Sequence, residues 1–214
     1  MWNYPLVMMT HLISRILRTL LASSFGLLVS ALSGQISSFT PGQPWPDSDG
    51  KPINAHGFSV IRYKDRYYWY GSQKIPGLTE SQKNEAGVSC YTSTDLLNWK
   101  NHGLVFSVRS DGQHEEITKA GILDRPKVFF HPPTKKFVMH FKLYPPQAAG
   151  DTKGTDVAYV GTATSRSPLG PFTYEGKYTG ANSPKGSGDF GIYQDDKGIF
   201  WHIAVRKPDK ILVC

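Results

Sequence analysis

The sequence predicts an all-β protein with the architecture of a β-propeller, and three observations support this fold class. A unit of apolar and aromatic strands recurs at intervals of about 65 to 70 residues, which is typical of propeller blades. Within each unit, short polar turns separate the strands in the manner of β-hairpins. After residue 34 the apolar residues show no helical periodicity.

Residues 1–34 are predicted to precede the fold as a secretory signal peptide. His11, Arg15 and Arg18 come before an apolar stretch at residues 20–32, and small residues end that stretch. A membrane anchor is the alternative, although the uninterrupted apolar run is shorter than the ~20 residues that a bilayer span needs. We therefore expect a secreted, extracellular protein whose residues 35–214 form one partial propeller domain.

Each repeat unit is expected to begin with a hairpin. The strand pairs are residues 55–61 and 67–70, residues 123–130 and 137–141, and residues 188–193 and 200–203. β-Branched and aromatic side chains favour these strands, and polar turn residues such as Lys64-Asp65 lie between them.

Two more strands follow each of the first two hairpins, which gives four strands to a blade. They lie around residues 87–93 and 159–165 and around the aromatic residues Trp99 and Phe172. The apolar run at residues 211–214 looks like the start of a further strand. About two and a half blades are thus present, whereas a closed propeller needs at least about four. We expect a truncated gene model or a fragment.

The aromatic run at residues 67–70 and the two cysteines are interpreted as structural. Tyr67, Tyr68, Trp69 and Tyr70 occupy the second strand of a blade, where side chains pack against neighbouring blades, so the core is a better interpretation than a sugar-stacking platform. Cys90 and Cys214 do not form a disulfide framework. A bond between them is one alternative, and burial of Cys90 as an apolar residue is the other.

Charge and motifs argue against several other functions. The net charge is +7, but the Lys and Arg residues are scattered through turns, so they indicate solvated faces rather than a nucleic-acid surface. There is no phosphate-binding glycine motif, and the seven His residues lack metal-ligand spacing. No cofactor, metal or nucleic-acid partner is expected.

The starts of the inner strands supply the candidate site. In a propeller these starts converge at one mouth of the central channel, and they carry His56, the pair Asp124 and Arg125, and Asp189. Converging carboxylates suit hydrolysis of a glycosidic bond, in which carboxyl groups protonate the leaving oxygen and activate water. Two alternatives remain: each Asp only caps a turn, or Asp124 and Arg125 form a local ion pair.

Several sequence blocks, in a fixed order, carry a family resemblance. They are Asn54-Ala55-His56-Gly57, Tyr68-Trp69-Tyr70-Gly71, residues 87–99, Asp124-Arg125-Pro126-Lys127-Val128, residues 135–139, residues 167–172 and Gly188-Asp189 with residues 195–198. In these blocks, which span roughly residues 45–203, the chain resembles glycoside hydrolase family 43, and most closely its exo-β-1,3-galactanases.

The resemblance implies a five-bladed propeller with a central pocket and inverting hydrolysis of galactan or of arabinan and xylan side chains, without a cofactor. It implies a polysaccharide or oligosaccharide as the partner, and a monomer for the complete protein. Asp189 matches the catalytic Asp that tunes the pKa of the acid. His56, Asp124 and Arg125 would bind the substrate, and Asp124 stands where the galactanases have Glu.

Two departures from the family pattern bear on activity. The first blade starts without the Asp that usually serves as the base, as in the galactanases. The resemblance implies that a later amide residue takes the place of this base. That residue and the general acid Glu would both lie beyond Cys214. We therefore expect this chain to be an inactive piece of a secreted glycosidase. The second hypothesis is a non-catalytic propeller that binds carbohydrate or another partner.

Overall fold

The computed structural model describes residues 35–75, 77, 85–108, 114–117, 121–144, 159–179, 188–206 and 210–213. Apart from Gln35, all of these belong to one compact unit, Ile36–Cys214. The signal peptide predicted at residues 1–34 lies outside the described residues. Within them, no helix has the length and apolar character required to cross a bilayer.

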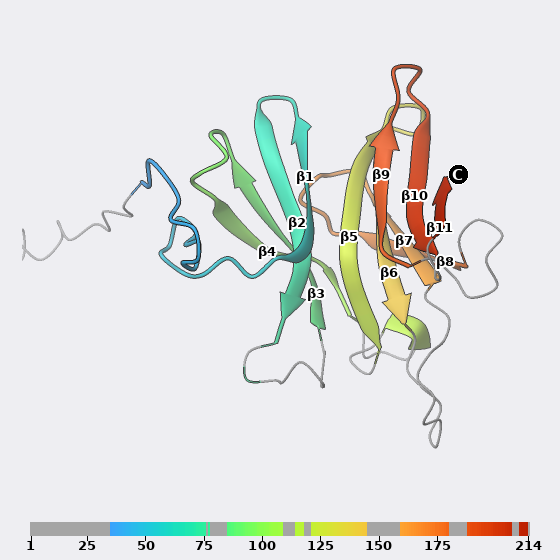
Figure 1. Cartoon of the computed structure of the whole chain (residues 1–214), viewed down its shortest axis with the longest axis horizontal. Helices are drawn as coiled ribbons and strands as arrows, with labels where there is room; N and C mark the ends of the chain where they lie inside the picture. Colours follow the sequence, from blue (N-terminus) through green and yellow to red (C-terminus); the bar gives the residue numbers. More distant parts are fainter. Residues whose placement is uncertain are drawn as a thin grey trace, which may run out of the picture. The chain divides into compact units, whose positions relative to one another are not determined.

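The described chain folds into three antiparallel sheets, each a simple meander in chain order (Figure 1). The first sheet contains β1 (His56–Tyr63), β2 (Arg66–Lys74), β3 (Glu85–Ser93) and β4 (Lys100–Ser107). The second contains β5 (Ile122–His131), β6 (Lys136–Tyr144), β7 (Tyr159–Ser165) and β8 (Thr173–Tyr178). The third contains β9 (Phe190–Gln194), β10 (Phe200–Arg206) and β11 (Lys210–Val213).

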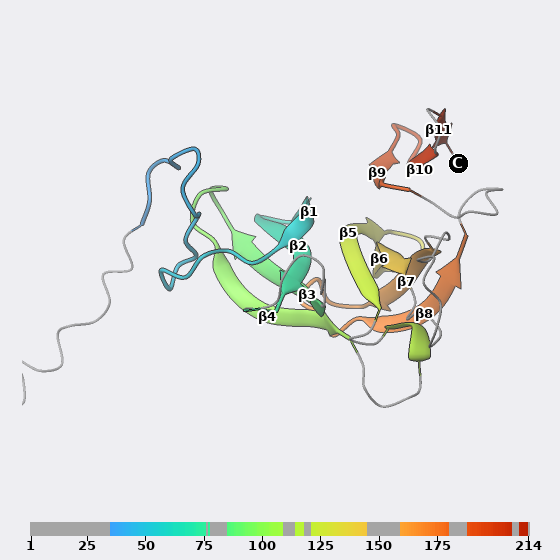
Figure 2. The same cartoon turned by 60° about the horizontal axis from the view of Figure 1, so that its bottom comes forward.

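This architecture confirms the predicted all-β fold, a partial propeller with two four-stranded blades and an incomplete third. All three predicted hairpins form, and the apolar run near the end of the chain is strand β11, which pairs with β10. Figure 2 shows the sheets face to face in chain order, with β5 next to β1 and to β9. The first strands of the sheets therefore form the inner edge of the blades.

One short helix departs from the all-strand expectation. The 3₁₀ helix η1 (Glu115–Ile117) lies between the first and second sheets in the sequence. Ile117 is fully buried in the core, and the Tyr174 hydroxyl donates to Glu116 Oε1 at 3.2 Å. Three residues are too short to produce a helical period in a sequence, so only tertiary contacts could define this element.

The main core lies between the first and second sheets and confirms the structural interpretation of the aromatic run. Tyr70 is fully buried, and Tyr68 and Trp69 are also buried. Phe141 of β6 contacts the ring of Phe106 of β4, with centroids 5.3 Å apart. Aromatic and aliphatic burial of this kind supplies most of the free energy that holds two sheets together.

Trp99 and Phe172, which mark the last strands of the first two blades, and Cys90 are also part of the interior. The side chains of Trp99 and Phe172 are buried, and Cys90 is fully buried in the core, as expected for an apolar residue. Cys214 lies outside the described residues, so the possible bond between the two cysteines stays a prediction.

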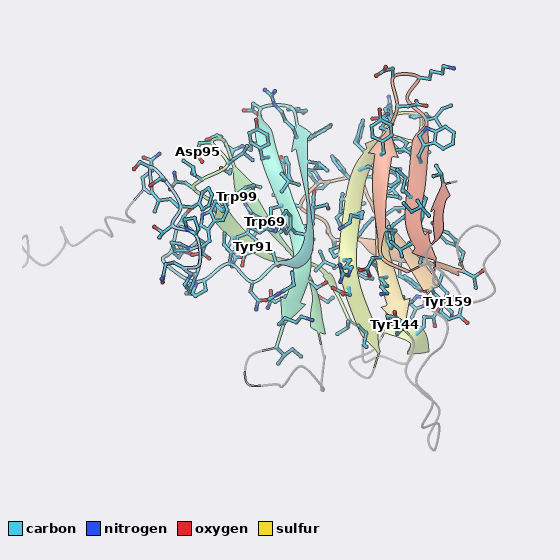
Figure 3. The ribbon with its side chains drawn as sticks, viewed as in Figure 1. Trp69, Tyr91, Asp95, Trp99, Tyr144 and Tyr159 are labelled. Carbon is cyan, nitrogen blue, oxygen red and sulfur yellow. The ribbon has the colours of Figure 1, made fainter. Side chains whose placement is uncertain are left out.

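A second aromatic cluster lies on the other face of the first sheet. Trp45, from the segment that precedes β1, packs edge-on against Trp69, and Trp69 packs edge-on against Trp99. Trp45 Nε1 also donates to the Leu97 carbonyl at 3.0 Å. Figure 3 shows Trp69, Tyr91 and Trp99 gathered on this sheet, with Asp95 at the turn between β3 and β4. This face is thus covered by residues that precede the first strand.

Two half-buried histidines lie at the junction of the second and third sheets. The His140 ring of β6 and the His202 ring of β10 have centroids 6.3 Å apart, and Phe190 stacks on His202. His140 also contacts Tyr178 of β8 and packs edge-on against Phe129 of β5. Burial, reinforced by the nearby His202, lowers the pKa of His140 to about 4.

We therefore expect acid to weaken the fold through His140. A pKa near 4 in the folded chain, against about 6.5 in the unfolded chain, means that the unfolded state binds more protons between these values. The stabilisation is complete above about pH 6.5 and is lost as the pH falls toward 4, with a total of about 3 kcal/mol. Thermal melting at about pH 7 and about pH 4.5 measures it.

The comparison of two variants isolates this contribution. His140→Phe removes the titrating group and should show a smaller loss of melting temperature on acidification than the wild type. His131→Asn, at the last residue of β5, is the matched control and should behave like the wild type. Equal acid sensitivity of wild type and His140→Phe would contradict the prediction.

The outer face of the third sheet is apolar and exposed. In the β10–β11 pair Val205 lies opposite Ile211 and Ile203 lies opposite Val213, so these side chains share one face. All four are exposed; Ile211 has 72% of its surface accessible and Val213 58%. In a propeller such a face packs against the next blade. Within the described part of the chain, nothing buries it.

Candidate functional site

The site is built on an irregularity in β5. The pairing of β5 with β6 shifts between Asp124 and Lys127, and Arg125 adopts a left-handed backbone with φ of 55°. The Asp124 Oδ1 atom accepts the N–H of Arg125 at 2.8 Å, which stabilises this turn of the chain. A non-glycine residue with a left-handed backbone is uncommon and costs conformational energy. Such residues cluster at functional sites, where the backbone conformation sets the direction of the side chain.

The left-handed Arg125 connects two carboxylates on different sheets. Its Nε atom lies 3.1 Å from Asp189 Oδ1 and 3.4 Å from Asp124 Oδ2. Asp124 belongs to β5, and Asp189 directly precedes β9. The structure thus brings together three of the four residues predicted for the site, and the local ion pair between Asp124 and Arg125, which was the alternative interpretation of these two residues, also forms.

Asp189 is held by its backbone and has one carboxylate oxygen available. Its carbonyl accepts the N–H of Val205 at 2.8 Å, which fixes its position beside β10. Both ion pairs of the side chain use Oδ1, and no described residue hydrogen-bonds to Oδ2. No described backbone N–H donates to the carboxylate, so the alternative role of a turn cap does not fit Asp189. About half of the side chain is exposed.

Sequence reasoning missed Lys142. This residue of β6 places Nζ 3.1 Å from Asp189 Oδ1, and its side chain is only 15% exposed. Its ammonium also lies 5.1 Å from the centroid of the Tyr144 ring, and Figure 3 shows Tyr144 at the end of β6. Burial disfavours the charge of Lys142, but interactions with Tyr144 and Asp189 outweigh it and raise its pKa.

The available signal for Lys142 was its place in the strand pattern. Residues of β6 alternate between buried and half-buried, and Lys142 shares the half-buried face with His140 and Tyr144. Because burial of an unpaired charge is costly, a charged side chain on a strand between two neighbouring sheets requires a partner of opposite charge or a hydrogen-bond acceptor. The sequence alone did not show that this partner would come from the next sheet.

His56 lies at the edge of this group. It begins β1, its side chain is exposed, and it makes no hydrogen bond or ion pair with a described residue. The next residue, Gly57, has a φ of 58° and packs directly against the pair on β5. A Cβ atom on Gly57 would lie 2.8 Å from Arg125 Cγ and 3.0 Å from Asp124 Oδ1. The backbone of Gly57 therefore forms one wall of the site.

We expect Gly57→Ala to disturb this wall. The added methyl group would meet Arg125 and Asp124 closer than contact distance, in a backbone conformation that disfavours alanine. The expected loss is about 1 to 3 kcal/mol in the free energy of unfolding, together with a displacement of the Arg125 and Asp124 side chains. Urea titration followed by circular dichroism measures the first. Gly42→Ala is the control, because it also has a positive φ but open space around it.

The described residues do not form a metal centre. Within them, no three His, Cys, Asp or Glu side chains gather in a way that could hold a metal ion. Asp124 and Asp189 instead pair with the cations of Arg125 and Lys142. This gives a balanced, solvent-accessible cluster of two carboxylates and two cations, which is suited to polar groups of a neutral ligand.

Comparison with known proteins shows similarity over most of the chain. The family model described as glycosyl hydrolases family 43 matches residues 51–212. A solved β-1,3-galactosidase of this family is 32% identical with a TM-score of 0.66, over 79% of this chain and 34% of that one. A search of curated proteins gives no match.

Two solved exo-β-1,3-galactanases are similar to the same degree. The enzyme from Phanerochaete chrysosporium, solved with galactose, is 30% identical with a TM-score of 0.63, over 78% of this chain and 36% of that one. The enzyme from Clostridium thermocellum is 30% identical with a TM-score of 0.62, over 78% of this chain and 35% of that one. The chain spans about a third of the length of these solved chains.

Proposed function

Since the chain belongs to the glycosyl hydrolases of family 43, we propose that it is part of a secreted enzyme that hydrolyses β-1,3-galactan or a related side chain with inversion. The observation that carries the proposal is the cluster of Asp124, Arg125, Lys142 and Asp189 at the inner edge of two adjacent blades. It lies in a chain similar to enzymes described as galactanases.

Each residue has a role that follows from its contacts. Asp189 is fixed through Oδ1 by two cations, so its Oδ2 is available to orient a general acid and to influence the pKa of that acid. Arg125 and Asp124 would hold hydroxyl groups of a galactose on the pocket floor, with His56 beside them. In inverting hydrolysis a carboxylic acid protonates the leaving oxygen while a water attacks from the opposite face.

The side chain of Asp124 limits how that residue reaches a sugar. It is one methylene shorter than the Glu expected from the resemblance, and its oxygens already contact the backbone and side chain of Arg125. In addition, Ser72 Oγ of β2 lies 3.5 Å from Asp124 Oδ1. A contact between Asp124 and the sugar would therefore run through a bridging water or through the Arg125 guanidinium.

The proposed activity can be tested on two proteins. One is the present chain without residues 1–34, and the other is the product of the genomic reading frame extended beyond Cys214. Release of galactose from β-1,3-galactan is measured for both. Activity of the extended protein and inactivity of the present chain are expected. Absence of hydrolysis of galactan, arabinan and xylan substrates by the extended protein would contradict the proposal.

A non-catalytic carbohydrate-binding propeller is the second candidate. It is favoured because the cluster of described residues holds no carboxyl group that is free of a cation. Among the described residues, only Asp124 and Asp189 contribute carboxylates to it, and both are paired with cations. This candidate predicts that galactose binds to the chain, as titration calorimetry can measure, and that no extension of the reading frame produces hydrolysis.

A further inference from the structure

Lys127 connects the inner strands of the first two blades through its ammonium group. It belongs to β5, two residues after Arg125, and its Nζ atom donates to the carbonyl oxygens of Gly57 at 2.9 Å and Phe58 at 3.0 Å. Both carbonyls lie in β1, at the irregularity between His56 and Ser59. Thus one side chain joins the irregular segments of two neighbouring strands.

The joined segments carry the site. The Gly57 backbone is the wall against which Arg125 and Asp124 pack, and Arg125 in turn reaches Asp189 on the third sheet. A third hydrogen bond between β5 and β1 runs from the N–H of Val128 to Ser59 Oγ at 3.2 Å. A displacement of the Gly57 carbonyl would therefore move the surface that supports Arg125.

We propose that Lys127 is a positioning residue that fixes the Gly57–Phe58 backbone of β1 and thereby holds His56 and Arg125 in the geometry needed to bind a sugar. This role rests on the proposed function of the site. It assigns to Lys127 no contact with substrate, because both of its hydrogen bonds run to the backbone of β1.

Aromatic contacts also hold the first two sheets together, at a distance from Lys127 along the strands. Toward the other ends of the same strands, Tyr63 of β1 packs against Phe130 of β5 and Phe137 of β6, with ring centroids 5.1 and 4.9 Å apart. These aromatic contacts and the buried core supply the free energy of blade packing. The two hydrogen bonds of Lys127 instead act at the site, where the backbone departs from regular pairing.

An ammonium suits this position because it can donate several hydrogen bonds at once. Lys127 donates charge-assisted hydrogen bonds to two carbonyl groups at the irregular segment of β1. Burial lowers the pKa of Lys127, with Arg125 acting in the same direction and the Asp124 and Asp189 carboxylates opposing both. The stem of Lys127 is half-buried between the blades.

The experiment compares Lys127→Met, which keeps the length of the side chain without donors, with Lys127→Arg, which keeps charge and donors. Lys100→Met, on an exposed position of β4, is the matched control. Ring signals of His56 are recorded by NMR and assigned with His56→Gln. Galactose affinity is measured by titration calorimetry, and melting is followed to verify folding.

We expect Lys127→Met to shift the His56 ring signals while those of His131 stay in place. We expect the dissociation constant for galactose to rise at least about tenfold, as the loss of hydrogen bonds to a charged group implies. Lys127→Arg should restore most of both properties, and Lys100→Met should change neither. Such a pattern supports positioning, since a general loss of stability would not be rescued selectively at His56.

Several results would overturn the proposal and separate it from the proposed function. Unchanged His56 signals in Lys127→Met would remove the positioning role, whether or not galactose binds. If the wild-type chain binds no galactose, the binding role of the site fails, and the His56 signals still decide the role of Lys127. If Lys127→Met does not melt cooperatively, Lys127→Gln replaces it. Failure of both to fold would make Lys127 a folding residue and overturn the proposal.

Discussion

Asp189→Asn is expected to lower kcat on β-1,3-galactan by about 100-fold to 10,000-fold in the protein translated from the extended reading frame. The amide keeps the shape of the side chain but loses the charge that Arg125 and Lys142 share at Oδ1. Without that charge, Lys142 loses its ion pair, Arg125 keeps only its pair with Asp124, and the general acid of the proposed mechanism loses the group that orients it. Initial rates of galactose release measure the effect.

Asp196→Asn provides the matched control for this substitution. Asp196 is exposed at the turn between β9 and β10 and makes no hydrogen bond or ion pair with a described residue. Its variant should hydrolyse galactan at the rate of the parent protein. Undiminished turnover by Asp189→Asn, with a wild-type melting temperature, would remove Asp189 from the mechanism.

Phe141→Ala is expected to destabilise the present chain by about 3 to 5 kcal/mol. Phe141 is fully buried between the first two sheets, where it contacts Phe106 and Tyr174. Its ring also packs against Gly161, which has no side chain at the point of contact. Truncation to alanine leaves a cavity in the core. The loss of stability therefore includes both the transfer free energy of the removed ring and the cost of the cavity.

Thermal melting followed by circular dichroism measures this loss. For a domain of this size, 3 to 5 kcal/mol corresponds to a fall of roughly 6 to 20 °C in Tm. Phe39→Ala is the control, because Phe39 has 58% of its surface exposed, and it should change Tm by only a few degrees. Equal effects of the two substitutions would contradict the assignment of Phe141 to the core.

The strands could be predicted because their signals are local. The alternation of apolar residues, the aromatic runs and the turn residues recur in each unit, and together with the apolar run at residues 211–214 they correctly indicated the eleven strands β1 to β11 of the described residues. Burial of Trp99 and Phe172 followed from the same positions in two blades. η1 gave no signal, because a three-residue helix is defined by the contacts of Ile117 and Glu116.

The candidate site was predicted in part, for a physical reason. Placing Asp124, Arg125 and Asp189 at the starts of inner strands was enough to predict that they would lie close together. Lys142 and Lys127 could not be found in this way, because each acts across a junction between sheets. The distance from a Lys ammonium to its partner depends on how the blades pack, and the local sequence pattern carries no information about this packing.

The amino-acid sequence by itself determined the all-β propeller class, the order of the strands and the family to which the chain belongs, because each rests on residues that are adjacent in the chain. Only the tertiary structure decided that Arg125 adopts a left-handed backbone and bridges two carboxylates. It also decided that Lys142 of β6 pairs with Asp189 and that Lys127 of β5 donates to the Gly57 carbonyl. The reason is that charge pairing depends on distances of 3 to 4 Å between blades, which packing sets and sequence spacing does not.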